Sequence, residues 1–218
     1  MKRGIAITIV CVMLSLLSCT KEKISGTGPM VTQTRTVSNF TAVSTTGSTN
    51  VYITQGPVFK VEVKGSGNLL PYYETKVISN TLLLGYKQNV NIKNDNTEVY
   101  ITMPILNAIN IFGSGSAIST GPFTGNTNFN ASISGSGNIS IEAGTAQNFF
   151  ATIAGSGHIH ALDFVAEIAE ITTSGSGNVE ITANNQLKVK ITGSGNVYYR
   201  GTPAITSTIS GSGVVIPR

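Results

Sequence analysis

The pattern of apolar and polar positions along the chain becomes regular after about residue 107. From there on, Ile and Val alternate with Ser, Thr and Asn around a recurring Gly-Ser-Gly unit. The unit begins at residues 65, 113, 135, 155, 175, 193 and 211, so its spacings from Gly113 onward are 22, 20, 20, 18 and 18 residues. Alternation with a period of two is typical of strands with one buried face. Each copy therefore predicts a strand, a tight bend and a second strand.

The residues that flank the unit keep one register in nearly every copy. Apolar residues stand two positions before the first glycine, as at Ile133 and Ile153, and two positions after the last, as at Ile139 and Ile159. An asparagine often follows the last glycine, as at Asn138. Units of this size cannot bury an apolar face alone, so the copies must stack. We expect internal ladders of Ile and Val, and a ladder of Gly-Ser-Gly corners in which Ser and Asn hydrogen-bond between coils.

A single dominant period without helical periodicity predicts an all-β fold. The expected architecture is a parallel β-helix built from repeats of about 18–22 residues. The alternative is an antiparallel β-sandwich of hairpins, with Gly-Ser-Gly as the hairpin loop; it would give alternating long and short spacings. A single domain is expected over residues 31–218, with an irregular part at 31–106 and regular repeats at 107–218.

The irregular part contains two further copies of the unit. One is the copy at 65–67 and the other is the degraded Gly47-Ser48-Thr49, which suggests that this part joins the same solenoid. Residues 71–106 would then form an insertion that bulges out or caps the open end. A cap is expected because an exposed terminal coil is an aggregation edge.

The N-terminus predicts export. Residues 1–18 have the pattern of a lipoprotein signal peptide, with two basic residues before an apolar stretch that is too short to span a bilayer. Leu16-Leu17-Ser18-Cys19 resembles the lipobox of bacterial lipoprotein precursors. The resemblance implies a lipidated Cys19 at the start of the mature chain and a membrane partner through this anchor. Residues 19–30, polar with Gly and Pro, then predict the lipidated cysteine and a tether.

The composition argues against nucleic-acid binding and against an internal disulfide. Charged residues make up 11% of the chain, against about 25% in an average globular protein. The net charge is +4, but Lys2 and Arg3 lie in the leader and no basic cluster remains, so nucleic acid is not an expected partner. The two cysteines are Cys11, inside the leader, and Cys19, so the mature chain cannot form an internal disulfide.

Catalysis on a β-helix would require clustered carboxylates on one exposed face. The chain has only two aspartates, Asp95 and Asp163, while Glu142 and Glu180 stand at different offsets from their preceding asparagines. We therefore expect neither an enzyme nor a cofactor. The Gly-Ser-Gly units also lack the Gly-Lys-Ser/Thr ending of a phosphate-binding loop.

Histidine and tyrosine are the remaining candidates for a site. His158 and His160 share one face of a strand and could contact a metal, with Glu180 aligned one coil on, but a polar outer face is the favoured interpretation. Two tyrosine pairs could form a binding surface, because each ring combines apolar area with a polar tip. They are Tyr72, Tyr73, Tyr198 and Tyr199, and one ring of each pair is expected to face the core.

Two sequence elements together carry a family resemblance. They are the serial Gly-Ser-Gly-Asn-Ile/Val copies and the upstream run Arg35-x-Val37-x-x-Phe40-x-x-Val43, followed by Val51-x-Ile53-x-Gln55-Gly56. In both respects the chain resembles the auto-transporter adhesin head domain, or GIN domain, of Bacteroidetes lipoproteins, over about residues 35–215. The resemblance implies a right-handed β-helix on the cell envelope. It implies adhesion by name and brings no catalytic residues.

We therefore expect a cell-envelope lipoprotein, in the outer membrane with its domain on the periplasmic or surface side. Its β-helical domain would be non-catalytic and would bind an unknown glycan or protein ligand. A carbohydrate-active β-helix enzyme is one alternative. A structural protein that assembles with copies of itself, as a homo-oligomer, is the other.

Overall fold

The computed structural model describes residues 22–218, so the predicted signal peptide and Cys19 lie outside the described residues. Over residues 22–218 the chain is all-β apart from the short 3-10 helix η1 (Leu70–Tyr72), and no helix there is long and apolar enough to cross a membrane. The strands are β1 (Glu22–Ser25), β2 (Met30–Arg35), β3 (Ala42–Gly47), β4 (Asn50–Gln55), β5 (Lys60–Ser66), β6 (Tyr73–Ile78), β7 (Thr81–Tyr86), β8 (Val90–Lys93), β9 (Glu98–Met103), β10 (Ala108–Gly113), β11 (Ser116–Thr120), β12 (Phe123–Gly135), β13 (Asn138–Ile141), β14 (Gly144–Gly155), β15 (His158–Gly175), β16 (Asn178–Gly193), β17 (Val197–Arg200), β18 (Ala204–Gly211) and β19 (Val215–Pro217).

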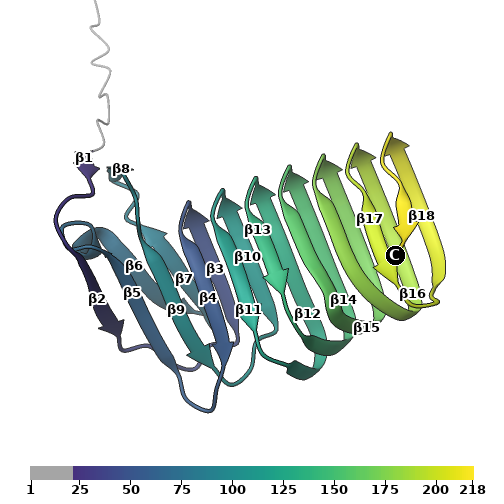
Figure 1. The fold of residues 1–218 in the computed structure, drawn as a ribbon, viewed down its shortest axis with the longest axis horizontal. Helices are drawn as coiled ribbons and strands as arrows, with labels where there is room; N and C mark the ends of the chain where they lie inside the picture. Colours follow the sequence, from purple (N-terminus) through teal and green to yellow (C-terminus); the bar gives the residue numbers. More distant parts are fainter. Residues whose placement is uncertain (1–21) are drawn as a thin grey trace, which may run out of the picture.

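The repeats form a parallel β-helix, and the predicted architecture is confirmed (Figure 1). In each coil one strand runs into a corner and another leaves it. Strands that enter corners make the first stack, in the order β3, β10, β12, β14, β15, β16, β18. Strands that leave corners make the second stack, in the order β4, β11, β13, β15, β16, β17, β19. All of these pairings are parallel, so the hairpin alternative is wrong for the repeats.

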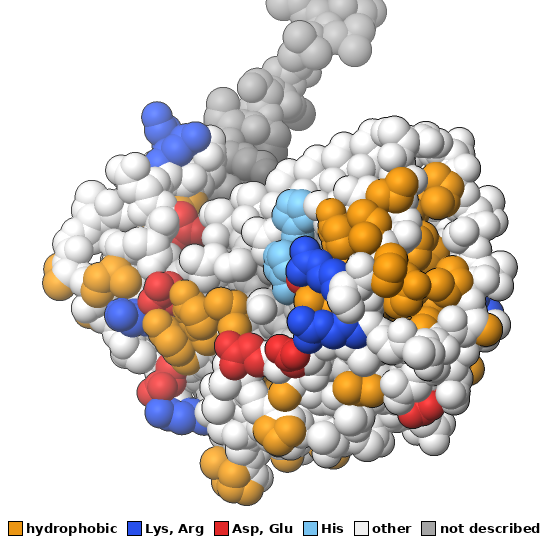
Figure 2. All heavy atoms as spheres, turned by 45° about the vertical axis from the view of Figure 1, so that its right-hand side comes forward, with side chains coloured by type: hydrophobic (Ala, Val, Ile, Leu, Met, Phe, Trp, Pro, Cys, Tyr) orange, Lys and Arg blue, Asp and Glu red, His pale blue; other side chains and the backbone are white. Residues whose placement is uncertain are grey.

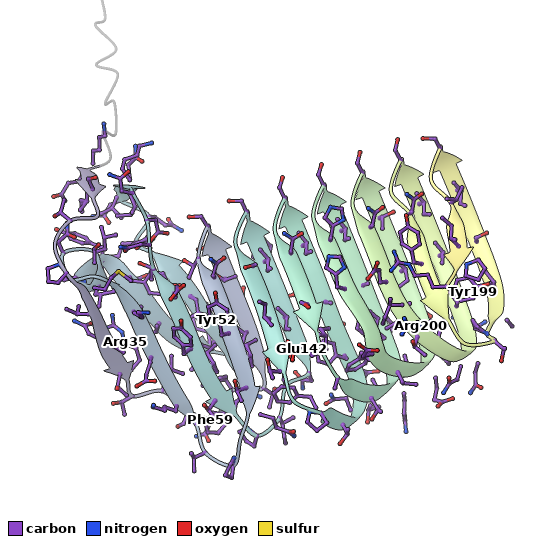
Figure 3. All side chains as sticks on the ribbon, in the orientation of Figure 1. Arg35, Tyr52, Phe59, Glu142, Tyr199 and Arg200 are labelled. Atoms are coloured by element: carbon purple, nitrogen blue, oxygen red, sulfur yellow. The ribbon has the colours of Figure 1, made fainter. Side chains whose placement is uncertain are left out.

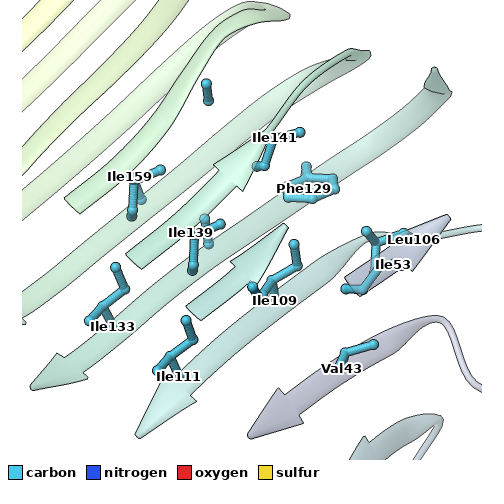
Figure 4. Packing of buried hydrophobic residues seen from close by; sticks show 14 of the residues in the cluster. Val43, Ile53, Leu106, Ile109, Ile111, Phe129, Ile133, Ile139, Ile141 and Ile159 are labelled. Atoms are coloured by element: carbon cyan, nitrogen blue, oxygen red, sulfur yellow. The ribbon is translucent and has the colours of Figure 1, made fainter. Parts of the chain in front are cut away.

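Apolar ladders fill the space between the two stacks, as the flanking pattern predicts (Figure 4). In the first stack Ile111, Ile133 and Ile153 align in register, and each is at most 1% exposed. In the second stack Ile139 aligns with Ile159, and both are fully buried. Three phenylalanines, whose ring centroids lie 4.9 to 5.9 Å apart, thicken the core where the long strands bend; they are Phe129, Phe149 and Phe164.

The corners need glycine for two reasons. Gly155 has φ 135°, in the region that side chains with a Cβ rarely adopt, and a Cβ there would collide with the carbonyl oxygen of Gly135. The backbone N–H of Ser156 donates to that same carbonyl at 3.0 Å. Asparagine side chains add the predicted links between coils, since Asn178 Oδ1 accepts from the backbone N–H of Asn196 at 2.8 Å.

One of the two irregular copies is a corner and the other is not. Gly47 has φ 86° and its carbonyl accepts the N–H of Ser114 at 2.8 Å, so the degraded copy begins the stack of corners. The expectation that the copy at 65–67 forms a coil is wrong, because Gly65 lies in β5, opposite Val31 of β2 in an antiparallel pair. Glycine is required at position 65 for space, since a Cβ would collide with the hydroxyl of Thr97.

The insertion caps the N-terminal end of the solenoid. The hairpin β6–β7 turns at Ser79 and Asn80, which have φ of 48° and 59°, and β7 then pairs in parallel with β3. On the second stack β9 pairs with β4, and β5 and β2 add antiparallel strands beyond it. Residues 22–25, within the segment expected to be a tether, form β1 and pair with β8, so pairing with the domain begins before residue 31.

Candidate binding face

The outward side chains of the second stack form one continuous line across the cap and the coils. We call this line the outer row; its members face one another in register from strand to strand. They are Glu62, Tyr100, Tyr52, Ile118, Ser140, His160, Glu180, Tyr198 and Ile216. At the usual strand spacing of about 4.8 Å the row is roughly 40 Å long. It therefore offers an extended strip rather than a closed pocket.

An aromatic pair occupies the part of the outer row nearest the cap. The rings of Tyr52 and Tyr100 are stacked, with centroids 5.0 Å apart and an interplanar angle of 16°. Tyr100 is 38% exposed, and its hydroxyl donates to Glu98 Oε2 at 2.8 Å, a hydrogen bond that raises the pKa of Tyr100. Ile118 follows on the next strand and is half-buried. Figure 3 shows Tyr52 on this part of the sheet.

A second line of side chains, two residues nearer the corners, runs beside the outer row and is mostly polar and neutral. It includes Asn50, Ser116, Asn138, His158 and Asn178, which align from strand to strand. Ser116 Oγ donates to Asn50 Oδ1 at 2.7 Å, and the backbone N–H of Asn178 donates to His158 Nδ1 at 3.3 Å. Such amide and hydroxyl groups can both donate and accept hydrogen bonds. The strip therefore combines apolar ring surface with neutral hydrogen-bonding groups.

The two histidines lie on this face as predicted, with their ring centroids 6.0 Å apart. His160 Nδ1 lies 3.1 Å from Glu180 Oε2, which confirms the expected alignment across one coil. Glu180 is also held by Arg218, whose guanidinium lies 2.9 Å from Oε1 and 4.6 Å from the centroid of the Tyr198 ring. Figure 2 shows the histidines beside basic side chains on the surface. Among residues 22–218 no three His, Cys, Asp or Glu side chains gather as a metal would require.

The predicted tyrosine pairs are not brought together. Tyr72 lies in η1 of the cap and Tyr198 in β17, toward opposite ends of the solenoid (Figure 1). Tyr73 is 3% exposed and packs edge-on against Tyr86. This confirms that one ring of the pair faces the core, and Tyr73 therefore does not belong to a binding surface. Tyr199 is half-buried against the core. Of the four predicted tyrosines, only Tyr198 lies in the outer row.

Tyr52 and Tyr100 were not predicted from the sequence, although a signal was present. The tetrapeptide Val-Tyr-Ile-Thr occurs at 51–54 and again at 99–102. The two copies pair residue for residue in β4 and β9. The insertion separates them along the chain and hides their pairing from a search for one constant period.

The carboxylates of this face are engaged by cations. Glu62 lies 2.8 Å from Lys60 Nζ, and Glu98 lies 3.7 Å from Lys64 Nζ. Glu180 is paired with Arg218. Each of these carboxylates is therefore already held in an ion pair.

Comparison with known proteins agrees with the fold. A putative adhesin from Bacteroides fragilis has a TM-score of 0.70 at 22% identity, covering 89% of this chain and 100% of that one. A structure described as a putative lipid binding protein from Parabacteroides distasonis has a TM-score of 0.60 at 23% identity, covering 90% and 100%. A putative adhesin from Parabacteroides merdae has a TM-score of 0.56 at 22% identity, covering 90% and 99%. No curated protein is significantly similar to the chain.

The family model for the putative auto-transporter adhesin, head GIN domain, matches residues 39–203. The match includes the Gly47 corner, the insertion and most of the regular coils. The family description names an adhesin rather than an enzyme, and it indicates a cell-envelope or surface protein. The chain therefore belongs to the putative auto-transporter adhesin, head GIN domain family.

Proposed function

We propose that this protein is a non-catalytic adhesin-type lipoprotein that binds a neutral glycan along the outer row. The observation that carries the proposal is the stacked pair Tyr52 and Tyr100 within an extended strip of amide and hydroxyl groups. Sugars present both apolar C–H surface and hydroxyls, which suit tyrosine rings and neutral hydrogen-bonding side chains. The strip is long, open and mostly neutral, so it suits a linear glycan chain more than a small molecule.

Binding to purified glycans tests this proposal. Tyr52→Ala and Tyr100→Ala should each weaken binding by about tenfold, the loss expected for one aromatic contact of about 1.4 kcal/mol. Tyr72→Ala is the matched control, because Tyr72 is also half-buried but lies outside the outer row. Equal losses in all three variants, or binding of a protein ligand without any glycan, would contradict the proposal.

The enzyme alternative is tested in the same assay. If the protein turned over a glycan, and Glu62→Gln or Glu98→Gln abolished that turnover, its function would be catalysis rather than binding. We expect no turnover, because both carboxylates are paired with lysines. Lipid is not the ligand we favour, although a related structure is described as lipid binding, because ladders of apolar side chains fill the space between the stacks.

The predicted membrane anchor has a separate test. Cys19→Ala should release the protein from outer-membrane fractions, since lipidation of that sulfur would provide the attachment. The attachment of the β-helix to the envelope would then depend on residues that precede β1. A protein that stays in the membrane fraction without Cys19 would refute the anchor and leave the binding proposal standing.

A further inference from the structure

Within residues 22–218 the last coil of the solenoid is not covered by a further coil, unlike the coils before it. Leu187 and Ile191 of β16 are 0% and 1% exposed, because β18 stacks on them. Their counterparts in β18, Ile205 and Ile209, are 44% and 40% exposed. Figure 2, with this end turned forward, shows hydrophobic side chains gathered there. The last described coil therefore presents an apolar row and the free backbone edge of a strand.

The strands β18 and β19 of this coil also lack the charges that normally protect an edge strand. Residues 201–217 contain no Asp, Glu, Lys or Arg. Edge strands usually carry inward charges or lysines that prevent pairing with other strands. At the capped end, by contrast, β6 carries Lys76 and Glu74, which form an ion pair at 2.9 Å. A head-to-tail contact between two copies would set β18 against this charged edge strand, whereas a contact between two C-terminal ends brings no charge from residues 201–217 into the junction.

Five of the eight residues of β18 read the same in both directions around Ser207. Ile205-Thr206-Ser207-Thr208-Ile209 reads identically forward and backward. Antiparallel pairing of this strand with its own copy, about a two-fold axis at Ser207, would set Ile205 opposite Ile209 and Thr206 opposite Thr208. The inward set, Ile205, Ser207 and Ile209, continues the rows of Leu187, Val189 and Ile191, so both apolar rows would meet across the axis.

From the palindrome, the exposed ladder and the missing charges we propose that two copies of this chain join through their C-terminal coils. The contact is isologous, with β18 of each copy extending the first stack of the other by antiparallel pairing. Cross-strand threonine pairs and apolar pairs stabilise such a junction. The paired molecule has its two caps at the far ends, so each copy's outer row stays clear of the junction over most of its length.

The first test measures the mass of the full-length chain in mild detergent by analytical ultracentrifugation over a wide concentration range. The expected result is a dimer whose dissociation constant rises at least about tenfold in Ile209→Asp, because pairing would bury the new carboxylate. Phe112→Asp is the control, since Phe112 is 52% exposed and lies on β10, away from this end. Circular dichroism checks that both variants keep the fold. A monomer throughout, open filaments, or a dimer insensitive to Ile209→Asp would overturn the proposal.

The second test fixes the register. With both native cysteines changed to serine, Ser207→Cys should give a covalent dimer with a short bifunctional thiol reagent, because the two Cβ atoms would lie about 4.5–5.5 Å apart. Ser210→Cys is the matched control, since the same pairing separates its two copies by roughly 20 Å along the strands. Equal cross-linking at both positions, or none at position 207, would overturn the two-fold pairing.

Discussion

The two ends of this solenoid differ in whether the core of the terminal coil is covered. At the N-terminal end β7 and β9 cover the first coil, and the antiparallel strands β6, β5 and β2 close the edge. At the C-terminal end the same core positions remain exposed in β18. The covering strands do not follow the repeat, because a cap has to be apolar toward the coil and polar toward water. Segments that follow the repeat form coils, and the segments that depart from it form the cap at the N-terminal end.

The cap also contains a network of polar side chains around Tyr86. Tyr86 Oη donates to Asp95 Oδ1 at 2.7 Å and lies 2.6 Å from Thr97 Oγ1. Asp95 Oδ1 in turn accepts the backbone N–H of Thr97 at 3.0 Å. The interior of the coils is instead almost wholly apolar. The difference predicts that the two regions respond to different kinds of substitution.

The largest expected effect compares neighbours in one ladder. Ile191→Ala should lower the free energy of unfolding by about 2–5 kcal/mol, because it opens a cavity under β18. Ile209→Ala, one coil on, should cost less than about 1 kcal/mol in the monomer, because Ile209 is already 40% exposed. Denaturant unfolding at low protein concentration measures both. Equal losses would mean that the last coil is covered in solution.

A smaller effect is expected in the cap. Tyr86→Phe should lower the free energy of unfolding by about 1–2 kcal/mol, since Asp95 loses a hydrogen bond donor. Chemical denaturation at neutral pH gives this value. Thr81→Val, in the same strand but with only a long hydroxyl contact of 3.5 Å to Ser79, is the control and should change little.

Tyr86 also makes the stability of the folded protein depend on pH. Burial, with a contribution from Asp95, raises the pKa of Tyr86, and burial raises the pKa of Tyr73. The folded state therefore holds these protons above the pH, about 10, at which an unfolded tyrosine releases them. Stability from this source is complete below about pH 10 and declines as the pH rises further. The decline should be shallower in Tyr86→Phe; an unchanged alkaline slope would contradict the assignment.

How far the sequence predicts the fold differs between the two regions. The ladder positions around Gly135 and Gly155 could be predicted, because every coil repeats the same alternation and the same glycine geometry. The cap could not be assigned strand by strand, because its pairings mix parallel and antiparallel partners that no period relates. The copy at 65–67 misleads for this reason: the same three residues serve a corner in one place and close packing against Thr97 in another.

The candidate face was predictable only where it lies on the regular coils. His160 and Glu180 stand at equal positions in successive repeats, so their contact follows from alignment. Tyr52 and Tyr100 meet because the chain leaves the solenoid after β4 and returns in β9, which spacing alone does not reveal. Tyr73 shows another limit, since the sequence predicts that one ring of the Tyr72–Tyr73 pair faces the core but does not show which one.

The smallest expected effect is a gain in stability within the coils. Thr173 occupies the ladder position between Ile153 and Ile191, is 1% exposed, and its buried Oγ1 has no hydrogen-bond partner in the described part of the chain. Thr173→Val keeps the shape and removes the unpaired hydroxyl, so the free energy of unfolding should rise by about 1 kcal/mol. Thr172→Val, next along β15 and facing outward, is the matched control and should change little. Thermal and denaturant unfolding measure the pair; a loss of stability in Thr173→Val would show that the hydroxyl is bonded in the interior and that the coils, like the cap, depend on buried polar contacts.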